Sequence, residues 1–168
     1  GGITQAGMRL WSQSNFGEDL FFLHRTGALY YWDASGGITT RGVLVSSLGG
    51  AAQVPTVANV AFVSDIFRFA FCFGVNAVGS SDLDPMLIRW SDQEDISDWN
   101  PTAINQSGSL SLSEGTTIIQ AIQARQEVLV WTDAAIYGFQ YLGAPEVWGA
   151  TLLGSNTTIA SPNAAIYS

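Results

Sequence analysis

The stretch 125–142 most constrains the fold, because it carries two short apolar runs around a small polar corner. The runs, Val128–Trp131 and Ile136–Tyr141, are rich in β-branched and aromatic residues, and the corner comprises residues 132–135. Runs of this length around a short Asp-containing break are typical of a β-hairpin. We therefore expect two antiparallel strands here.

Two earlier stretches repeat this hairpin with variations. They are 19–33, with runs Leu20–Leu23 and Ala28–Trp32, and 68–92, with runs Phe69–Phe73 and Met86–Trp90 joined by the longer loop 74–85. The first and last hairpins align without a gap, Phe21 to Tyr30 on Val128 to Tyr137. A recurring hairpin indicates a repeat architecture.

Further short runs complete each repeat. Lead-in strands are expected at Val54–Val63 and Thr116–Ala121, and closing strands at Gly42–Leu48 and Val147–Leu153. No stretch shows a sustained helical spacing of apolar residues, and the β-branched start of Thr116–Ala121 favours strand. The fold class we predict is all-β, with antiparallel four-stranded blades of a partial β-propeller.

The repeats predict about three blades and the beginning of a fourth. Their expected bounds are roughly 1–48, 54–112 and 116–153, with the first strand of a further blade at 157–168. Three blades do not close a ring. The chain also begins without Met, so we expect it to be a fragment of a longer chain.

Charge and cysteine content exclude several classes of function. The net charge is −8, and all six basic residues are Arg. Proteins that grip phosphate need a basic patch, so we do not expect a DNA-gripping domain. The one cysteine, Cys72, lies in an apolar run and can form no internal disulfide. No apolar run approaches the roughly 20 residues of a membrane helix.

The most acidic segment, 91–101, is a candidate cation site. Its Asp92, Asp95 and Asp98 could supply oxygens to Ca²⁺, although the order of a known calcium loop is missing. A solvated acidic turn is the favoured interpretation, and no metal ligand is predicted. A sialidase-type Asp box is also missing, because the segment has Ser97 and Trp99 but no glycine.

The sequence does not indicate an enzymatic function. His24 is the only histidine, and neither a nucleophile elbow nor Cys/His spacing accompanies it. No Gly-rich phosphate loop is present. We therefore predict no catalytic residue and no cofactor. A hydrolase using Asp92 or Glu94 stays as the last-ranked alternative.

A Trp followed closely by Asp occurs in each repeat. The pairs are Trp32 with Asp33, Trp90 with Asp92 and Trp131 with Asp133. A feature of every repeat indicates a structural role, in which Trp fills space between sheets and Asp accepts backbone N–H bonds in a turn.

Four segments resemble a family of tailed-phage virion proteins. They are RLWSQSNFGEDL (9–20), YYWDASGG (30–37), RWSDQEDISDWNPTA (89–103) and the stretch 124–164. The family is the large β-propeller tail nozzle or hub class of short-tailed phages, the tail tubular protein B-like proteins. The similarity covers most of the chain and is dense in Trp, Asp and Gly.

This resemblance implies a structural role in the virion, in the phage tail, with no catalytic residues. It implies a homohexamer below the portal and adaptor rings, which forms a genome-exit conduit and offers surfaces to tail fibres or spikes. Genomic DNA would pass through the lumen without specific binding, and an acidic, Lys-free chain suits such a conduit. The alternative is a carbohydrate-binding propeller that recognises host surfaces, in which exposed Trp11, Trp99 or Trp148 would stack on sugar rings.

Overall fold

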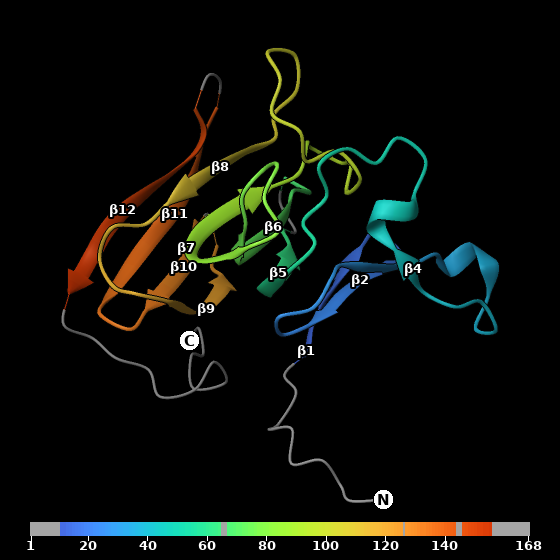
Figure 1. Ribbon diagram of the computed structural model, residues 1–168, viewed down its shortest axis with the longest axis horizontal. Coiled ribbons are helices and arrows are strands. Elements are labelled where there is room, and N and C mark those ends of the chain that lie inside the picture. The colour runs from blue at the N-terminus through green and yellow to red at the C-terminus, as the bar shows by residue number, and fades with distance from the viewer. Residues whose placement is uncertain (1–10, 65–66, 126, 144–145, 156–168) are drawn as a thin grey trace, which may run out of the picture.

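The protein is built from three antiparallel four-stranded β-sheets (Figure 1). The computed structural model describes residues 11–64, 67–125, 127–143 and 146–155, and the side chain of Trp11 lies outside this description. Within these ranges the only helical elements are two short 3₁₀ turns, η1 (Ala34–Gly36) and η2 (Val45–Ser47). None of the described helices is long and apolar enough to cross a membrane.

Each sheet is formed by four strands that are consecutive in the chain. The first sheet contains β1 (Trp11–Phe16), β2 (Asp19–His24), β3 (Tyr30–Trp32) and β4 (Val43–Leu44). The second contains β5 (Ala58–Val63), β6 (Ala70–Asn76), β7 (Leu83–Trp90) and β8 (Gly108–Ser111). The third contains β9 (Ile118–Gln123), β10 (Glu127–Thr132), β11 (Ala135–Gly143) and β12 (Val147–Ser155).

The predicted all-β class and the four-stranded antiparallel units are confirmed. Two strands differ from expectation. β1 extends to Phe16 through mostly polar residues, and the sequence pattern indicated no strand there. The run Gly42–Leu48 forms only the two-residue β4 before the chain turns into η2. The strand expected at 157–168 lies outside the described residues.

The gapless alignment of the first and last hairpins is wrong by one residue. Phe22 pairs with Tyr30, so the alignment would pair Leu129 with Tyr137. Leu129 instead pairs with Gly138, and Val130 pairs with Tyr137. Because side chains alternate between the two faces of a strand, a shift of one residue moves a side chain to the other face.

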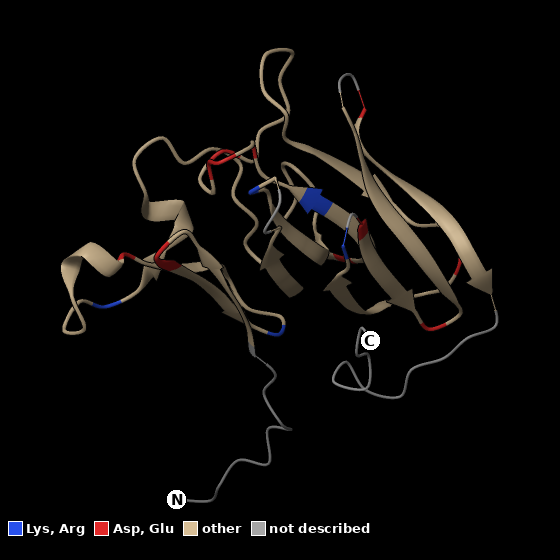
Figure 2. Cartoon of the chain, turned by 180° about the vertical axis from the view of Figure 1, so that it is seen from behind, with Lys and Arg blue, Asp and Glu red and all other residues tan. Residues whose placement is uncertain are grey.

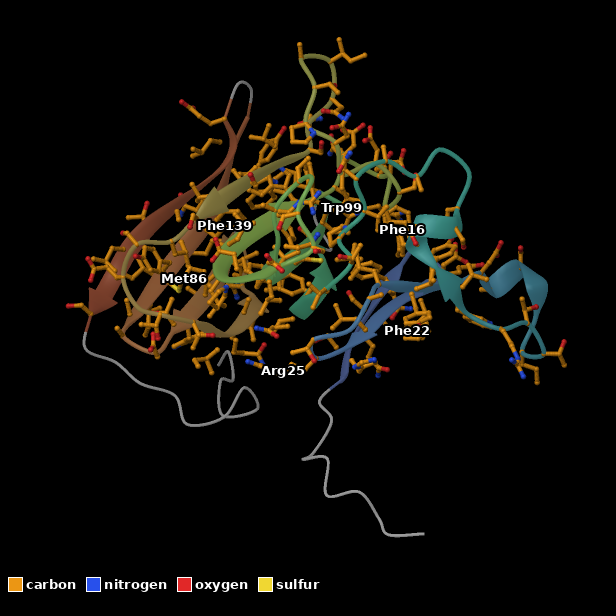
Figure 3. The ribbon with its side chains drawn as sticks, in the orientation of Figure 1. Phe16, Phe22, Arg25, Met86, Trp99 and Phe139 are labelled. Atoms are coloured by element: carbon orange, nitrogen blue, oxygen red, sulfur yellow. The ribbon has the colours of Figure 1, made fainter. Side chains whose placement is uncertain are left out.

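The second sheet is packed on both faces. Along β6, the rings of Phe71 and Phe73 lie in a core shared with the third sheet, whereas Ala70 and Cys72 lie in a core shared with the first. The alternation of large and small side chains follows from the two-residue period of a strand. Phe139 lies in the core between the second and third sheets, and Trp99 lies in the other (Figure 3).

The core between the second and third sheets is largely aromatic. The Trp148 ring meets the Phe71 ring edge-on at 4.8 Å between centroids and stacks on Phe139 at 5.3 Å. Aromatic pairs at these distances and angles stabilise a core beyond the effect of buried area alone.

The three sheets fan out from their first strands. β1, β5 and β9 lie on the inner side of the fan, and β4, β8 and β12 lie towards its periphery (Figure 1). This arrangement brings together residues far apart in the sequence and creates the surface described next.

Candidate functional site

The candidate site is the surface where the first strands of the three sheets meet, which we call the inner surface. A cleft of about 260 Å³ opens there. Its lining comes from β1, β5 and β9: Ser12, Gln13, Val60, Ala61, Phe62, Gln120 and Ala121. All three sheets contribute, so the cleft exists only when they are packed together.

Side-chain bonds hold β1 against β5 at this surface. The Ser14 hydroxyl accepts a hydrogen bond from the backbone N–H of Val63 at 3.0 Å and donates to the carbonyl oxygen of Val63 at 3.4 Å. These two bonds satisfy the partly buried hydroxyl of Ser14. The polar residues of β1 give no strand pattern in the sequence, but one of them, Ser14, forms the contact between β1 and β5.

The lining of this cleft carries no charged side chain. Its polar groups are a hydroxyl of Ser12 and carboxamides of Gln13 and Gln120. Neutral groups of this kind form exchangeable hydrogen bonds but do not neutralise phosphate, and none is an acid or base near neutral pH. Charged residues lie mostly at turns and strand ends (Figure 2).

A second depression lies beside the turn between β1 and β2. Its volume is about 170 Å³, and Asn15, Gly17, Val63, Ser64 and Arg68 line it. Arg68 has a left-handed backbone with φ of 54°. Its N–H donates to the carbonyl oxygen of Ser64 at 2.9 Å, and its carbonyl oxygen accepts from the N–H of Glu94 at 2.8 Å.

In the acidic segment, the aspartate carboxylates accept hydrogen bonds from backbone N–H groups. Asp92 accepts from the N–H groups of Gln93 and Gln106 at 2.9 and 2.8 Å. Asp95 accepts from the N–H of Ser97 at 2.9 Å, and Asp98 accepts from the N–H of Asn100 at 3.1 Å. Each carboxylate accepts from a different set of backbone N–H groups, and the three do not gather into one cation site.

No group of three or more acidic, His or Cys side chains is placed to hold a metal ion within the described residues. The calcium hypothesis for Asp92, Asp95 and Asp98 thus gains no support from the geometry.

The aspartates of the Trp–Asp pairs act as the sequence predicted. Asp33 accepts from the N–H of Ser35 at 2.8 Å, and Asp133 accepts from the N–H of Thr116 at 2.7 Å. Hydrogen bonds from the Ser35 and Thr116 side chains are the main cause that lowers the pKa of each aspartate. Among the three tryptophans of these pairs, Trp90 is buried between sheets, whereas Trp32 and Trp131 lie half-buried on the other faces of their sheets.

Two of the three tryptophans proposed for sugar stacking are buried. Trp99 is 1% exposed, and Trp148 is 4% exposed. Both fill inter-sheet cores, Trp99 from the segment between β7 and β8 and Trp148 from the start of β12. Trp11 is the third candidate, and its side chain lies outside the described part of the chain.

His24 lies at the end of β2, where its Nδ1 is 3.2 Å from the carbonyl oxygen of Arg25. Its ring covers Gly27: a Cβ built there would lie 2.6 Å from the ring atoms. The structure therefore places His24 against the turn between β2 and β3.

Sequence reasoning missed Arg89, which is 1% exposed. Its guanidinium donates to the carbonyl oxygens of Asn76, Gln53 and Trp99 at 3.0, 2.5 and 3.2 Å. Burial lowers the pKa of this group. The alternation of β7 could have indicated its inward direction, but a lone arginine in a strand is more often exposed.

Comparisons with known proteins add no identification: no protein-family model matches the sequence, and no curated protein matches it.

Proposed function

We propose that the chain is part of a β-propeller in a bacteriophage tail nozzle or hub, with a structural role in the virion. The observation that carries this proposal is the uncharged cleft lined by β1, β5 and β9. The resemblance of segments 9–20, 30–37, 89–103 and 124–164 to tail proteins supports it independently. The fan of three four-stranded sheets is compatible with propeller blades around an axis.

The chemistry of the inner surface suits a conduit for DNA. Each contact between a DNA phosphate and an Arg or Lys side chain would add salt-dependent binding energy that retains the DNA. The Ser12, Gln13 and Gln120 side chains in the lining add no charged contact to phosphate. The net charge of −8 repels polyanions at longer range. The genome would slide past such a surface without specific binding.

In this proposal the protein works as a homohexamer below the portal and adaptor rings, as the resemblance implies. Loops at the ends of the sheets would serve as platforms for fibres or spikes. No catalytic residue takes part. The carbohydrate-binding alternative is weakened, because Trp99 and Trp148 are buried.

The direct test is immunogold electron microscopy of phage particles with antibodies raised against the purified chain. We expect label on the tail axis. Label confined to the capsid, or a failure of the antibodies to detect the chain in purified virions, would contradict the proposal.

A further inference from the structure

The depression beside the β1–β2 turn contains an arginine side chain that bonds to no described residue. The depression has a volume of about 170 Å³ and is lined by Asn15, Gly17, Val63, Ser64 and Arg68. The Arg68 guanidinium lies over the turn, because a Cβ built on Gly17 would be 3.6 Å from its Nη1. Within the described part of the chain, no group accepts a hydrogen bond from this guanidinium and no carboxylate forms an ion pair with it. Its N–H donors can therefore bind a group from outside the chain.

The backbone holds Arg68 in a conformation that is unfavourable for a residue with a side chain. Its φ is 54°, in the left-handed region where Gly is the unstrained residue. Two backbone hydrogen bonds fix it there, one to the carbonyl oxygen of Ser64 at 2.9 Å and one from the N–H of Glu94 at 2.8 Å. Strained residues of this kind are concentrated at ligand-binding sites. An arginine at this position indicates a role for its side chain.

Ser64 adds a buried hydroxyl to the same depression. The residue is 1% exposed, and its hydroxyl has no hydrogen-bond partner within the described residues. Buried polar groups in proteins are nearly always bonded to protein, water or a ligand. Asn15, which is exposed, adds a carboxamide to the lining. The depression thus combines one cation with two neutral donors.

We propose that this depression binds a carboxylate group. The planar fork of the Arg68 guanidinium matches the two oxygens of a carboxylate, and charge-assisted hydrogen bonds of this kind are strong. The hydroxyl of Ser64 and the carboxamide of Asn15 donate to the same oxygens. A volume of about 170 Å³ accommodates a carboxylate together with water molecules.

Charge and shape favour a carboxylate over a phosphate. In the sequence, Glu18 follows Gly17 and Asp65 follows Ser64, and the chain carries a net charge of −8. These charges disfavour a doubly negative phosphate at a single guanidinium. A phosphodiester continues as a chain on both sides and needs an open groove, whereas a carboxylate enters end-on. The ligand is therefore distinct from DNA, and the proposal does not rest on the role in a phage tail.

The same carboxylate chemistry can come from two sources. One is a small organic acid in solution, and the other is an Asp or Glu side chain of a neighbouring protein. Both present the same two oxygens to Arg68, so the experiment needs one probe for each source.

The first experiment is an NMR titration of the full ¹⁵N-labelled chain with sodium acetate, with sodium chloride as the reference salt. We expect the amide signal of Gly17 to shift and saturate with acetate only. Arg68→Gln should raise the Kd at least about ten-fold, because it removes the charge-assisted bonds. Arg41→Gln is the matched control, because Arg41 is exposed in the loop between η1 and β4 and should leave the Kd unchanged.

Two further variants separate binding from a structural role. Ser64→Ala removes a hydroxyl without a partner in the described chain, and Arg68→Gly relieves a left-handed backbone. Both should weaken acetate binding while keeping a Tm close to that of wild type or above it. A Tm well below wild type in both variants would assign these side chains to the fold and overturn the proposal.

Three other results overturn the proposal. They are the lack of a saturable shift with acetate, a shift of equal size with chloride, and equal Kd values for Arg68→Gln and Arg41→Gln. Dimethyl phosphate that binds more tightly than acetate would contradict the carboxylate assignment.

A capped peptide, acetyl-Gly-Glu-Gly-amide, distinguishes the two sources. A Kd for this peptide at least about ten-fold below that of acetate supports a protein side chain as the ligand, since contacts beside the carboxylate then add to binding. A Kd equal to or above that of acetate supports a small organic acid.

Discussion

Arg89 shows how one residue connects three segments of the chain. Its guanidinium joins the end of β6 at Asn76, the loop before β5 at Gln53 and the acidic segment at Trp99. The Trp99 ring centroid lies 6.0 Å from its guanidinium carbon. A buried charge is tolerated only when its donors are satisfied, and here backbone carbonyls satisfy them.

Replacing Arg89 with Ala is expected to lower the free energy of unfolding by about 3–5 kcal/mol. The substitution leaves buried carbonyl oxygens without donors and opens a cavity beside Trp99. Urea unfolding followed by fluorescence measures the loss. Arg41→Ala is the control, because exposed Arg41 should change stability by no more than about 0.5 kcal/mol. Equal stability of the two variants would show that Arg89 is not a structural anchor.

At the scale of elements, a β-bulge in β6 moves Val75 to the face opposite Phe73. Phe73 contacts the third sheet, whereas Val75, two residues on, contacts the first. The pairing of β6 with β7 shifts between these two residues, and Gly74 between them has φ of 65°. Bulges bend a strand and redirect its side chains.

Gly74→Ala is expected to lower the free energy of unfolding by about 2–4 kcal/mol. A left-handed backbone is unfavourable for Ala, and the new Cβ would lie 2.9 Å from Nδ2 of buried Asn59. Gly154→Ala is the matched control, because nothing lies within 4 Å of a Cβ built there. Thermal unfolding compares the two, and a Gly74→Ala protein as stable as the control would contradict this account of the bulge.

Asp133 ties the β10–β11 turn to the chain that enters β9. Its carboxylate accepts from the hydroxyl and N–H of Thr116 and from the N–H of Thr117. These bonds, led by the Thr116 side chain, hold the pKa of Asp133 below its usual value in the folded state.

The depressed pKa of Asp133 gives stability a pH dependence of known sign. The stabilisation is present above the unfolded-state pKa of about 3.9 and is lost as pH falls through the lower folded-state pKa. Asp133→Asn should therefore be less stable than wild type near neutral pH, and the difference should shrink below about pH 4. Urea unfolding at several pH values measures it, with Asp82→Asn as control. A difference that grew on acidification would contradict the assignment.

The hairpins were predictable because their strands are apolar or β-branched and their corners are short. β2–β3, β6–β7 and β10–β11 all lie where the sequence placed them. β1 was missed, since its residues are mostly polar; one of them, Ser14, bonds to the backbone of β5. The strand register of the last hairpin could not be predicted either, because adding or removing one residue in a turn leaves the pattern of apolar residues almost unchanged.

For the whole molecule, the sequence indicated the sheets but not their packing. The inner surface combines Gln13, Phe62 and Gln120 from three sheets, and no local pattern connects them. The burial of Trp99 and Trp148 likewise depends on contacts between sheets. Long-range contacts of this kind leave no short-range signal in one sequence.

The most direct test of the structural role is cryo-electron microscopy of the protein on intact phage tails. We expect density for the three-sheet fan in a sixfold ring on the tail axis, with β1, β5 and β9 turned towards the channel. Density that places the chain away from the tail axis, or its absence from the particle, would contradict the account.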